Sequence, residues 1–358
     1  MKKIILLLLV GSTFLGISQN GNPASPYYNG FNWTLTGSNL KTALATKITA
    51  THTNFLIYTP GVWNALKQVD LDPTNSGNVL LVYGWEDGSD GDATNDRTRG
   101  KDNNGGANGD WNREHIFAQA LGDPDLGQDG PGADAHMLRA CDVQRNSSRS
   151  NKLYASGSGN SGSVGANWYP GDEWKGDVAR IIMYMYLRYD TQCLPTFVTS
   201  GTTVSSDPNM VNLLLQWNAE DPVSQNEDNR NTYLGNASNN YGQGNRNPFI
   251  DNPYLATLIW GGPIAQNRWP TIFLNSTSFD LNNEVRIYPN PSKSEVNIAS
   301  PMDLEKVEII NFNGQIIYQY NNPKRVNDTF TLTNLPKGFY LLKLSSNKES
   351  LTKKILIN

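Results

Sequence analysis

The pattern of apolar residues changes near residue 280, and this change most limits how the chain can fold. Downstream of it the sequence consists of short alternating runs, among them "EVRIYPNPS", "KVEIINFNGQIIYQY" and "GFYLLKLSS". Apolar residues at every second position are typical of strands with one buried face, and turn signals such as Asn313-Gly314 separate the runs. Residues 284–358 are therefore predicted to form a small all-β antiparallel sandwich of six or seven strands.

The part before residue 280 has mostly helical spacing of its apolar residues. Helices are expected in "GSNLKTALATKIT" with Ser38 as N-cap, in "GDVARIIMYMYLRY" with Asp177 as cap, and in "DPNMVNLLLQWNAEDPV" and "NPYLATLIWGG". The run "NVLLVYGW", residues 78–85, is instead typical of a strand. A chain of 358 residues can bury two cores, so the predicted fold class is α+β, with a helix-rich first domain before the sandwich.

The N-terminus has the features of a secretory signal peptide. Lys2 and Lys3 precede an apolar run, and Gly16-Ile17-Ser18 offers a small-x-small cleavage pattern. The run is too short to span a bilayer, so an exported protein without stable membrane insertion is expected. The predicted domains are a signal peptide at 1–18, the helix-rich domain at 19–275, a linker at 276–283 and the sandwich at 284–358.

A long polar segment lies within the first domain. Residues 86–110 read "EDGSDGDATNDRTRGKDNNGGANGD", which offers almost no side chain to a core. Its carboxylates could bind calcium, but no register places oxygen ligands at alternate positions with a glycine at the sixth, as an EF-hand requires. The segment is therefore predicted to be a solvated surface loop beside the active site.

Charge and cysteine content exclude some classes of protein. Of the net charge of −4, residues 281–358 contribute +3 and the two N-terminal lysines +2, which leaves −9 for the part between them. This charge argues against a domain that holds nucleic acid by bulk electrostatics, and a phosphodiester would need a divalent cation or local basic patches to bind there. Cys141 and Cys193 are the only cysteines, so a disulfide framework is excluded, while one bridge or two buried thiols stay open.

Glu114 and His115 adjoin in "NREHIF", directly after the polar loop. A neutral imidazole can accept a proton from water, and a carboxylate beside it can hold a hard divalent cation. Successive side chains on a strand point to opposite faces, so both could serve one site only from a bend or strand end. By itself, such a pair is as well explained by a surface or core histidine.

A second polar segment follows in "DAHMLRACDVQRNSSRSNK", residues 134–152. From about Leu138 onward it is interpreted as a helix, with Asp142, Asn146 and Arg149 on one face. An amide oxygen and a guanidinium on that face suit a metal ligand and a phosphate clamp. The alternative is an ordinary solvent-exposed polar face.

Together with "LLQWNAEDPVSQNEDNRN" (214–231) and "GQGNRNPFIDNP" (242–253), these segments resemble the bacterial endonuclease I family over about residues 27–260. The core of that family is a ββα-metal unit, also called a His-Me finger. The resemblance implies that His115 is the general base and that Arg149 contacts phosphate. It also implies that Glu114 and Asn146 hold one metal ion, which is Mg²⁺, with Mn²⁺ and Ca²⁺ as alternatives. It further implies structural roles for a set of polar residues: Asp134, His136, Asn151, Arg230, Asn231, Asn245, Arg246 and Asn247.

The C-terminal segment is similar to the sorting domain of proteins exported by the type IX secretion system. The similarity rests on "YPNPS" (288–292), "LPKGFYLLKL" (335–344) and the basic tail "LTKKILIN" at the C-terminus. It implies type IX secretion machinery as a partner, with export through the periplasm and outer membrane to the cell surface or medium. The alternative is a carbohydrate-binding or adhesion sandwich.

The leading hypothesis is a secreted, non-specific endonuclease that hydrolyses DNA to 5′-phosphate ends, with activity on RNA left open. The sequence offers neither a base-reading helix nor a stacking platform, which suits indiscriminate backbone recognition. A non-catalytic calcium-binding surface adhesin is the alternative from another class. A zinc hydrolase is a third, disfavoured because three histidines without HExxH spacing give too few ligands. The oligomeric state is left open.

Overall fold

A computed structural model describes residues 21–273, 285–300, 304–326, 328–346 and 349–358. The chain divides into two compact units, with the boundary between Ile272 and Phe273. The expected signal peptide and the expected linker lie outside the described residues, and the predicted domain limits stay predictions.

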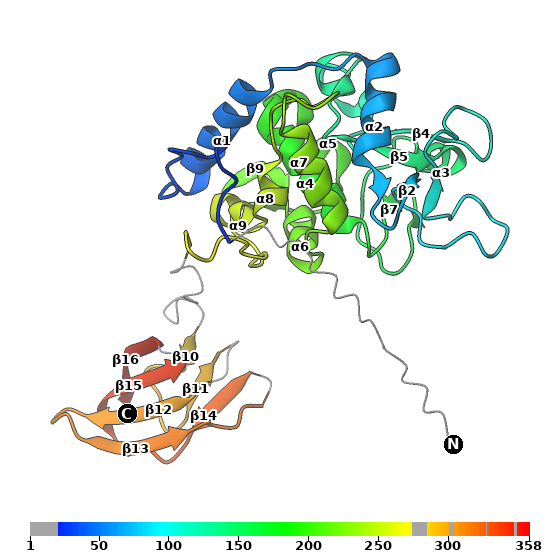
Figure 1. The fold of residues 1–358 in the computed structure, drawn as a ribbon. Helices are drawn as coiled ribbons and strands as arrows, with labels where there is room; N and C mark the ends of the chain where they lie inside the picture. The colour runs from blue at the N-terminus through cyan, green and yellow to red at the C-terminus, as the bar shows by residue number, and fades with distance from the viewer. Residues whose placement is uncertain (1–20, 274–284, 301–303, 327, 347–348) are drawn as a thin grey trace, which may run out of the picture. The chain divides into compact units, whose positions relative to one another are not determined.

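The first unit is built around one buried helix. α4 (Lys175–Tyr189) packs against α1 (Gly37–Thr51), α6 (Asn212–Glu220) and α8 (Pro248–Asp251), and almost all of its side chains are buried (Figure 1). The remaining helices are shorter: α2 (Trp63–Val69), α3 (Val143–Arg149), α5 (Pro195–Val198), α7 (Gln225–Leu234) and α9 (Tyr254–Trp260). Single helical turns occur at η1 (Tyr58–Val62), η2 (Gln119–Leu121), η3 (Gly130–Ala133) and η4 (Asp190–Cys193).

Short antiparallel strands complete the first unit. β1 (Leu71–Asp72), β2 (Asn75–Leu80) and β3 (Thr98–Gly100) form one sheet. Three further pairs are β4 (Trp111–His115) with β5 (Leu138–Asp142), β6 (Gly162–Val164) with β7 (Asn167–Tyr169), and β8 (Thr203–Val204) with β9 (Asp207–Val211). Helices and strands are thus mixed, and the predicted α+β class is confirmed.

Two helix predictions were wrong in part, because paired strands occupy the start of each segment. Leu138–Asp142 is strand β5, paired with β4 and buried throughout, and helix α3 begins only at Val143. Likewise β9 occupies Asp207–Val211, and α6 begins at Asn212. In both cases pairing with a distant or preceding strand outweighs local helical spacing.

Helix starts and the polar loop also differ from expectation. α1 begins at Gly37, before Ser38, and α4 begins at Lys175, so Asp177 lies inside its first turn. The loop 86–110 is not solvated throughout, since it contains β3, and Arg99 on that strand is buried. Arg99 donates to Oδ2 of Asp142 at 2.6 Å, so an ion pair fastens the loop to the start of α3.

The second unit is the expected antiparallel sandwich, with seven strands in its described part. One sheet contains β10 (Arg286–Tyr288), β11 (Val296–Ala299) and β14 (Thr329–Leu332). The other has β13 (Ile316–Asn321), β12 (Lys306–Asn311), β15 (Gly338–Ser346) and β16 (Glu349–Ile357). Ile298, Ile309 and Leu342 belong to one buried cluster to which both sheets contribute. Among all described residues, no helix combines the length and apolarity needed to cross a membrane.

Candidate active site

β4, β5 and α3 form a ββα unit beside α2 (Figure 1). The antiparallel register pairs Glu114 with Arg139 and His115 with Leu138, so His115 is the last residue of its strand. α3 follows directly after β5, and the side chain of Asp142, the last residue of β5, caps this helix by accepting from the backbone N–H groups of Gln144 and Arg145. The sequence predicted the unit's main residues but not this strand-to-helix junction.

His115 is half-buried at the end of β4, where its ring stacks on Tyr58 with centroids 5.6 Å apart. Its Nε2 lies 3.1 Å from the carbonyl oxygen of Gly132. A carbonyl can only accept, so Nε2 carries the hydrogen and Nδ1 carries the free lone pair. Burial, with smaller contributions from Arg113 and Arg149, lowers the pKa of His115 to about 4. The imidazole is therefore neutral at physiological pH and can accept a proton at Nδ1.

Glu114 points to the opposite face of β4 and is 2 % exposed. Its Oε1 accepts a hydrogen bond from the hydroxyl of Tyr83 at 2.8 Å and lies 3.4 Å from Nη1 of Arg149. Among the described residues, none donates a hydrogen bond to Oε2. Burial raises the pKa of Glu114 to about 7, although Arg149 and Tyr83 oppose the shift. A bound cation would favour the ionised carboxylate that burial disfavours.

Asn146, on α3, is oriented by β4. Its Nδ2 donates to Oδ1 of Asn112 at 2.8 Å and lies 3.4 Å from the carbonyl oxygen of Arg113. Within the described part of the chain, its Oδ1 accepts no hydrogen bond. Asn112 and Glu114 are two residues apart on β4 and share a face, so Asn146 lies on the Glu114 side of the strand. Glu114 and Asn146 thus lie on the same side of β4, each with one side-chain oxygen that accepts no hydrogen bond from the described residues.

Arg149 lies inside the protein, with 1 % exposure. Its Nη1 donates to the carbonyl of His115 at 3.0 Å and its Nη2 to the carbonyl of Ile116 at 2.9 Å. The guanidinium also stands 4.8 Å from the ring centroid of Tyr154. In this arrangement Arg149 holds the chain at the end of β4, and the predicted phosphate contact stays a prediction.

Tyr83 contacts the site, and the sequence reasoning missed it. The residue lies beyond the end of β2 at φ 73°, a backbone conformation unusual for a bulky side chain. Its hydroxyl lies 2.6 Å from that of Tyr154, which donates to the carbonyl of Ile116 at 3.0 Å. β2 ends at Leu80, whereas the sequence predicts a strand over the whole run "NVLLVYGW". Its Tyr-Gly pair was the available sign of a turn, because a Cβ on Gly84 would lie 2.2 Å from the carbonyl oxygen of Asp96.

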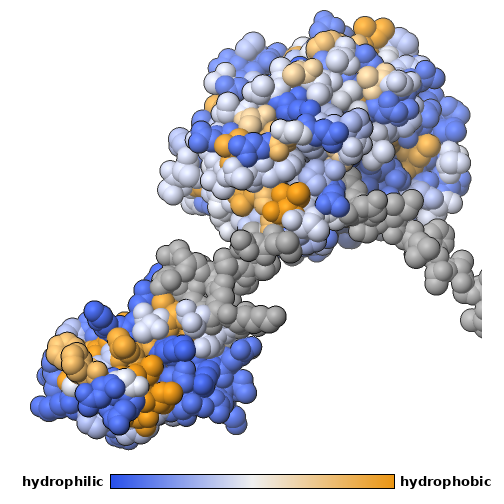
Figure 2. Space-filling view, turned by 60° about the vertical axis from the view of Figure 1, so that its left-hand side comes forward, coloured by the Kyte–Doolittle hydropathy of each residue, from blue (hydrophilic) through white to orange (hydrophobic). Residues whose placement is uncertain are grey.

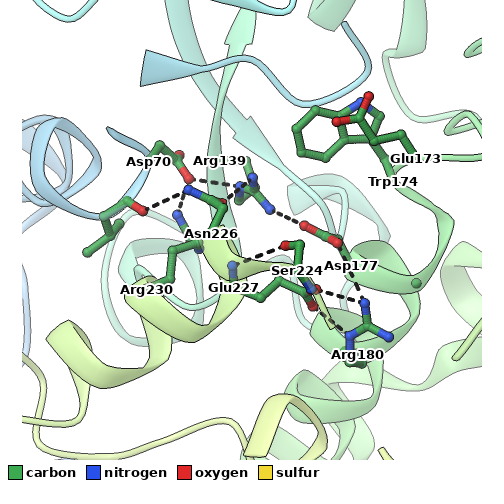
Figure 3. A network of polar contacts seen from close by, with 12 residues as sticks. Asp70, Arg139, Glu173, Trp174, Asp177, Arg180, Ser224, Asn226, Glu227 and Arg230 are labelled. Carbon is green, nitrogen blue, oxygen red and sulfur yellow. Dashed lines mark hydrogen bonds and ion pairs between the residues drawn. The ribbon is translucent and has the colours of Figure 1, made fainter. Parts of the chain in front are cut away.

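A buried network of ion pairs holds β5 against α4 and α7 (Figure 3). Arg139 contacts Asp70 at 2.9 Å and Asp177 at 2.8 Å. Arg180 then joins Asp177 to Glu227, with Nε of Arg180 2.5 Å from the Glu227 carboxylate. Burial and the neighbouring Glu227 raise the pKa of Asp177 well above its usual range. The network ties β5 to α4 and α7 and so fixes the strand that pairs with Glu114.

The expected bracing residues have structural contacts. Asp134 accepts from the hydroxyls of Tyr184 at 2.7 Å and Tyr189 at 2.9 Å, and Nε2 of His136 lies 2.9 Å from the carbonyl of Asn245. Further members of the set are buried and hydrogen-bonded within the protein: Arg230, Asn231, Asn245, Arg246 and Asn247. Asn151 is exposed.

The two thiols are free and buried, so the bridge considered from the sequence does not form. Cys141 faces the carbonyl of Val82, with Sγ 3.5 Å from the oxygen. No group of three or more His, Cys, Asp or Glu side chains suited to hold a metal occurs in the described ranges. Any metal at the ββα unit would thus rest on few protein ligands, and the acidic loop offers no such group.

Comparison with known proteins identifies both units. Residues 36–254 match the family described as Endonuclease I, and residues 286–358 match the secretion system C-terminal sorting domain. The extracellular ribonuclease of Bacillus amyloliquefaciens is 42% identical over 234 residues, which is 63% of this chain and 74% of that protein. The extracellular ribonuclease of Bacillus subtilis (strain 168) is 41% identical over 254 residues, 66% of this chain and 81% of that protein.

One similar solved structure comes from work on PorZ, a surface component of the type IX secretion system of Porphyromonas gingivalis. It is 21% identical to this chain, and the match covers 23% of this chain and 12% of the solved chain. Its TM-score of 0.20 supports no structural argument. The family match sets aside the non-catalytic adhesin considered from the sequence. The chain belongs to the endonuclease I family, as a secreted or cell-surface nuclease that carries a C-terminal sorting domain.

Proposed function

We propose that this nuclease is a metal-dependent, non-specific endonuclease that hydrolyses DNA and RNA to products with 5′-phosphate ends. His115 acts as the general base, and Glu114 and Asn146 hold one Mg²⁺. The observation that carries the proposal is the hydrogen bond between Nε2 of His115 and the Gly132 carbonyl, because it leaves Nδ1 basic and unprotonated.

The two metal-ligand candidates fit a hard divalent cation. Oε2 of Glu114 and Oδ1 of Asn146 are oxygens that accept no hydrogen bond from the described residues, and both side chains are held by their other atoms. Mg²⁺ is typically bound by one or two protein oxygens, water and substrate phosphate, so a site with a single carboxylate suits it. When bound, the cation would stabilise the negative charge that develops on the phosphate and the leaving 3′ oxygen.

The residues of the chain would carry out the rest of the reaction. Nδ1 of His115 takes a proton from a water molecule, whose oxygen forms a bond to phosphorus as the bond from phosphorus to the 3′ oxygen breaks. The leaving 3′ oxygen takes up a proton from a second water molecule, so the products are a 5′-phosphate and a 3′-hydroxyl, and His115 returns its proton to solvent. Arg149 holds the carbonyls of His115 and Ile116 and so fixes the direction of the base.

The substrate is proposed to include RNA because both named relatives are extracellular ribonucleases. Direct phosphate contacts and the cation must supply the affinity, since the part of the chain between the N-terminal lysines and residue 281 carries a net charge of −9. Activity should therefore fall steeply as salt concentration rises.

The test is incubation of the purified chain with supercoiled plasmid and, separately, with structured RNA. Cleavage is expected with Mg²⁺, its loss with chelator, and its return when Mg²⁺ is added in excess. His115→Ala and Glu114→Gln should abolish cleavage. The 5′ ends of the products should accept a labelled phosphate from a kinase only after phosphatase treatment.

Each arm tests a separate part of the proposal. Cleavage that survives chelator contradicts the metal, and cleavage that survives His115→Ala contradicts the base. No cleavage of either substrate under any divalent ion contradicts the proposed substrates. Circular dichroism on each variant confirms that a loss of activity is not a loss of fold.

A further inference from the structure

An exposed apolar segment lies next to the His115 site. The face of the first unit in Figure 2 is mostly polar, with few apolar residues. Among the described residues of that unit, Phe55 is 64% exposed and Ile57 is 59% exposed, the highest values for large apolar side chains there. Both belong to residues 52–57, which connect α1 to η1. Neither side chain has a role in the proposed hydrolysis.

This segment is held in place by hydrogen bonds. The backbone N–H groups of Thr53 and Asn54 donate to the carbonyl of Gln243 at 3.0 and 3.2 Å. The Asn54 side chain donates to the carbonyls of Ala237 and Gly242 at 2.9 and 2.8 Å. The backbone next to Phe55 is therefore held in one position by hydrogen bonds, and Phe55 is exposed from this fixed backbone.

One face of the Phe55 ring is supported and the other is open. The ring stacks on buried His52, with centroids 4.6 Å apart and an interplanar angle of 18°. His52 is itself held by Arg188 and Gln243. A flat ring backed on one side and exposed on the other has the geometry of a platform for another flat, apolar group.

Tyr58 connects this platform to the site. Its ring stacks on His115 and also lies under the guanidinium of Arg113, with Cζ 3.5 Å from the ring centroid. Arg113 and His115 are two residues apart on β4 and so share a face. Phe55 and Tyr58 are three positions apart in the chain, which limits the distance between their Cα atoms to roughly 10 Å. A strand that is cleaved at His115 and contacts the Arg113 cation would bring a nearby base to Phe55.

We propose that Phe55 is a stacking platform for an unpaired nucleobase of the substrate strand, and that the nuclease thus prefers single-stranded nucleic acid. This inference rests on the proposed function of the His115 site. It departs from the expectation, drawn from the sequence, that the chain has no stacking platform. Stacking tolerates any base, because every base has a π-face, and it does not depend on the unfavourable net charge of the domain.

Binding of oligonucleotides to the full chain with His115→Ala, which blocks cleavage, tests the proposal by fluorescence anisotropy. The probes are a labelled single-stranded oligouridylate, the same strand in a duplex, and an abasic oligonucleotide of equal length and charge. Adding Phe55→Ala should weaken binding of the single strand by roughly 5- to 150-fold, the effect of one stacked base. Binding of the abasic strand should not change, and Phe55→Trp should restore affinity for the single strand.

Ile264→Ala is the matched control, because Ile264 is an exposed apolar residue of the same unit, at 47%. It should leave every dissociation constant unchanged. In the active enzyme, Phe55→Ala should raise KM for single-stranded substrate and leave kcat unchanged. Phe55→Leu, which keeps an apolar side chain without a π-face, should behave like Phe55→Ala.

The failure of this proposal can be distinguished from failure of the proposed function. If the wild-type chain cleaves nucleic acid and Phe55→Ala binds the single strand as tightly as its parent, the stacking role is wrong while the nuclease site stands. The stacking role would also be wrong if Phe55→Ala weakened binding of the abasic strand as much as binding of the single strand, because the effect would then not involve a base. A chain that neither binds nor cleaves nucleic acid would overturn both.

Discussion

The hydroxyl of Tyr83 donates a hydrogen bond of 2.8 Å to Oε1 of Glu114, and both side chains are buried. Tyr83 reaches this position from a backbone with φ 73°, a conformation that costs free energy for a bulky residue. The hydrogen bond occupies one carboxylate oxygen and leaves Oε2 without a partner among the described residues. Tyr83 therefore orients the carboxylate of Glu114, the proposed metal ligand.

Tyr83→Phe is expected to weaken divalent-ion binding by about 10- to 100-fold, because it removes the partner that orients Glu114. Isothermal titration with Mn²⁺ in the absence of nucleic acid measures this directly. The metal concentration that gives half-maximal cleavage should rise in parallel.

Tyr28→Phe is the control for that substitution. The hydroxyl of Tyr28 also donates to a buried carboxylate at 2.8 Å, but its acceptor is Asp251, outside the ββα unit. It should cost about 1–3 kcal/mol of unfolding free energy without changing metal affinity. Equal metal affinity in Tyr83→Phe and wild type would contradict the orienting role.

Arg149→Met should destabilise the fold by about 3–5 kcal/mol, because it leaves the buried Glu114 carboxylate without its ion-pair partner and removes one hydrogen-bond donor from each of the His115 and Ile116 carbonyls. Urea unfolding measures the change. A variant as stable as wild type, but with a raised KM, would instead assign Arg149 to the substrate phosphate, as the sequence predicted.

Local sequence was sufficient to predict the sandwich, several helices and the His115 segment, because each has its own periodicity or motif. It failed at β5, whose five residues are all buried and show no alternation. Arg139 is tolerated there only because Asp70 and Asp177, distant in sequence, neutralise it. The contacts of Tyr83 and of Phe55 also depend on tertiary structure, so no local pattern could have revealed them.

The network behind β5 gives a further prediction. Arg139→Met should lower the unfolding free energy by about 3–5 kcal/mol, since it leaves Asp70 and Asp177 with less compensation in the interior. Lys67→Met is the control, because the carboxylate of its partner Asp102 is 77% exposed and such pairs contribute at most about 1 kcal/mol. Similar losses for the two variants would argue against the network as a support of β5.

The stability of the fold should also depend on pH through His136. Burial lowers the pKa of His136 to about 4, although Asp134 and the Asn245 carbonyl oppose the shift. Above pH 6.5 the histidine is neutral in both folded and unfolded chains, so its contribution is fully present. As the pH falls from 6.5 toward 4, the unfolded chain binds a proton that the folded chain does not, and about 3 kcal/mol of stability is lost.

Unfolding free energies measured in urea across this range test the effect. Near pH 5, each unit by which the pH falls should lower the unfolding free energy of the wild type by about 1 kcal/mol more than that of His136→Gln. The reason is that the variant takes up one proton fewer when it unfolds. At pH 8 no histidine titrates in either chain, so the unfolding free energies of the wild type and of His136→Gln should change with pH at the same rate. Measurements at this pH are therefore the internal control. A common slope near pH 5 would mean that folded His136 protonates as readily as the unfolded residue, in conflict with its burial against the Asn245 carbonyl.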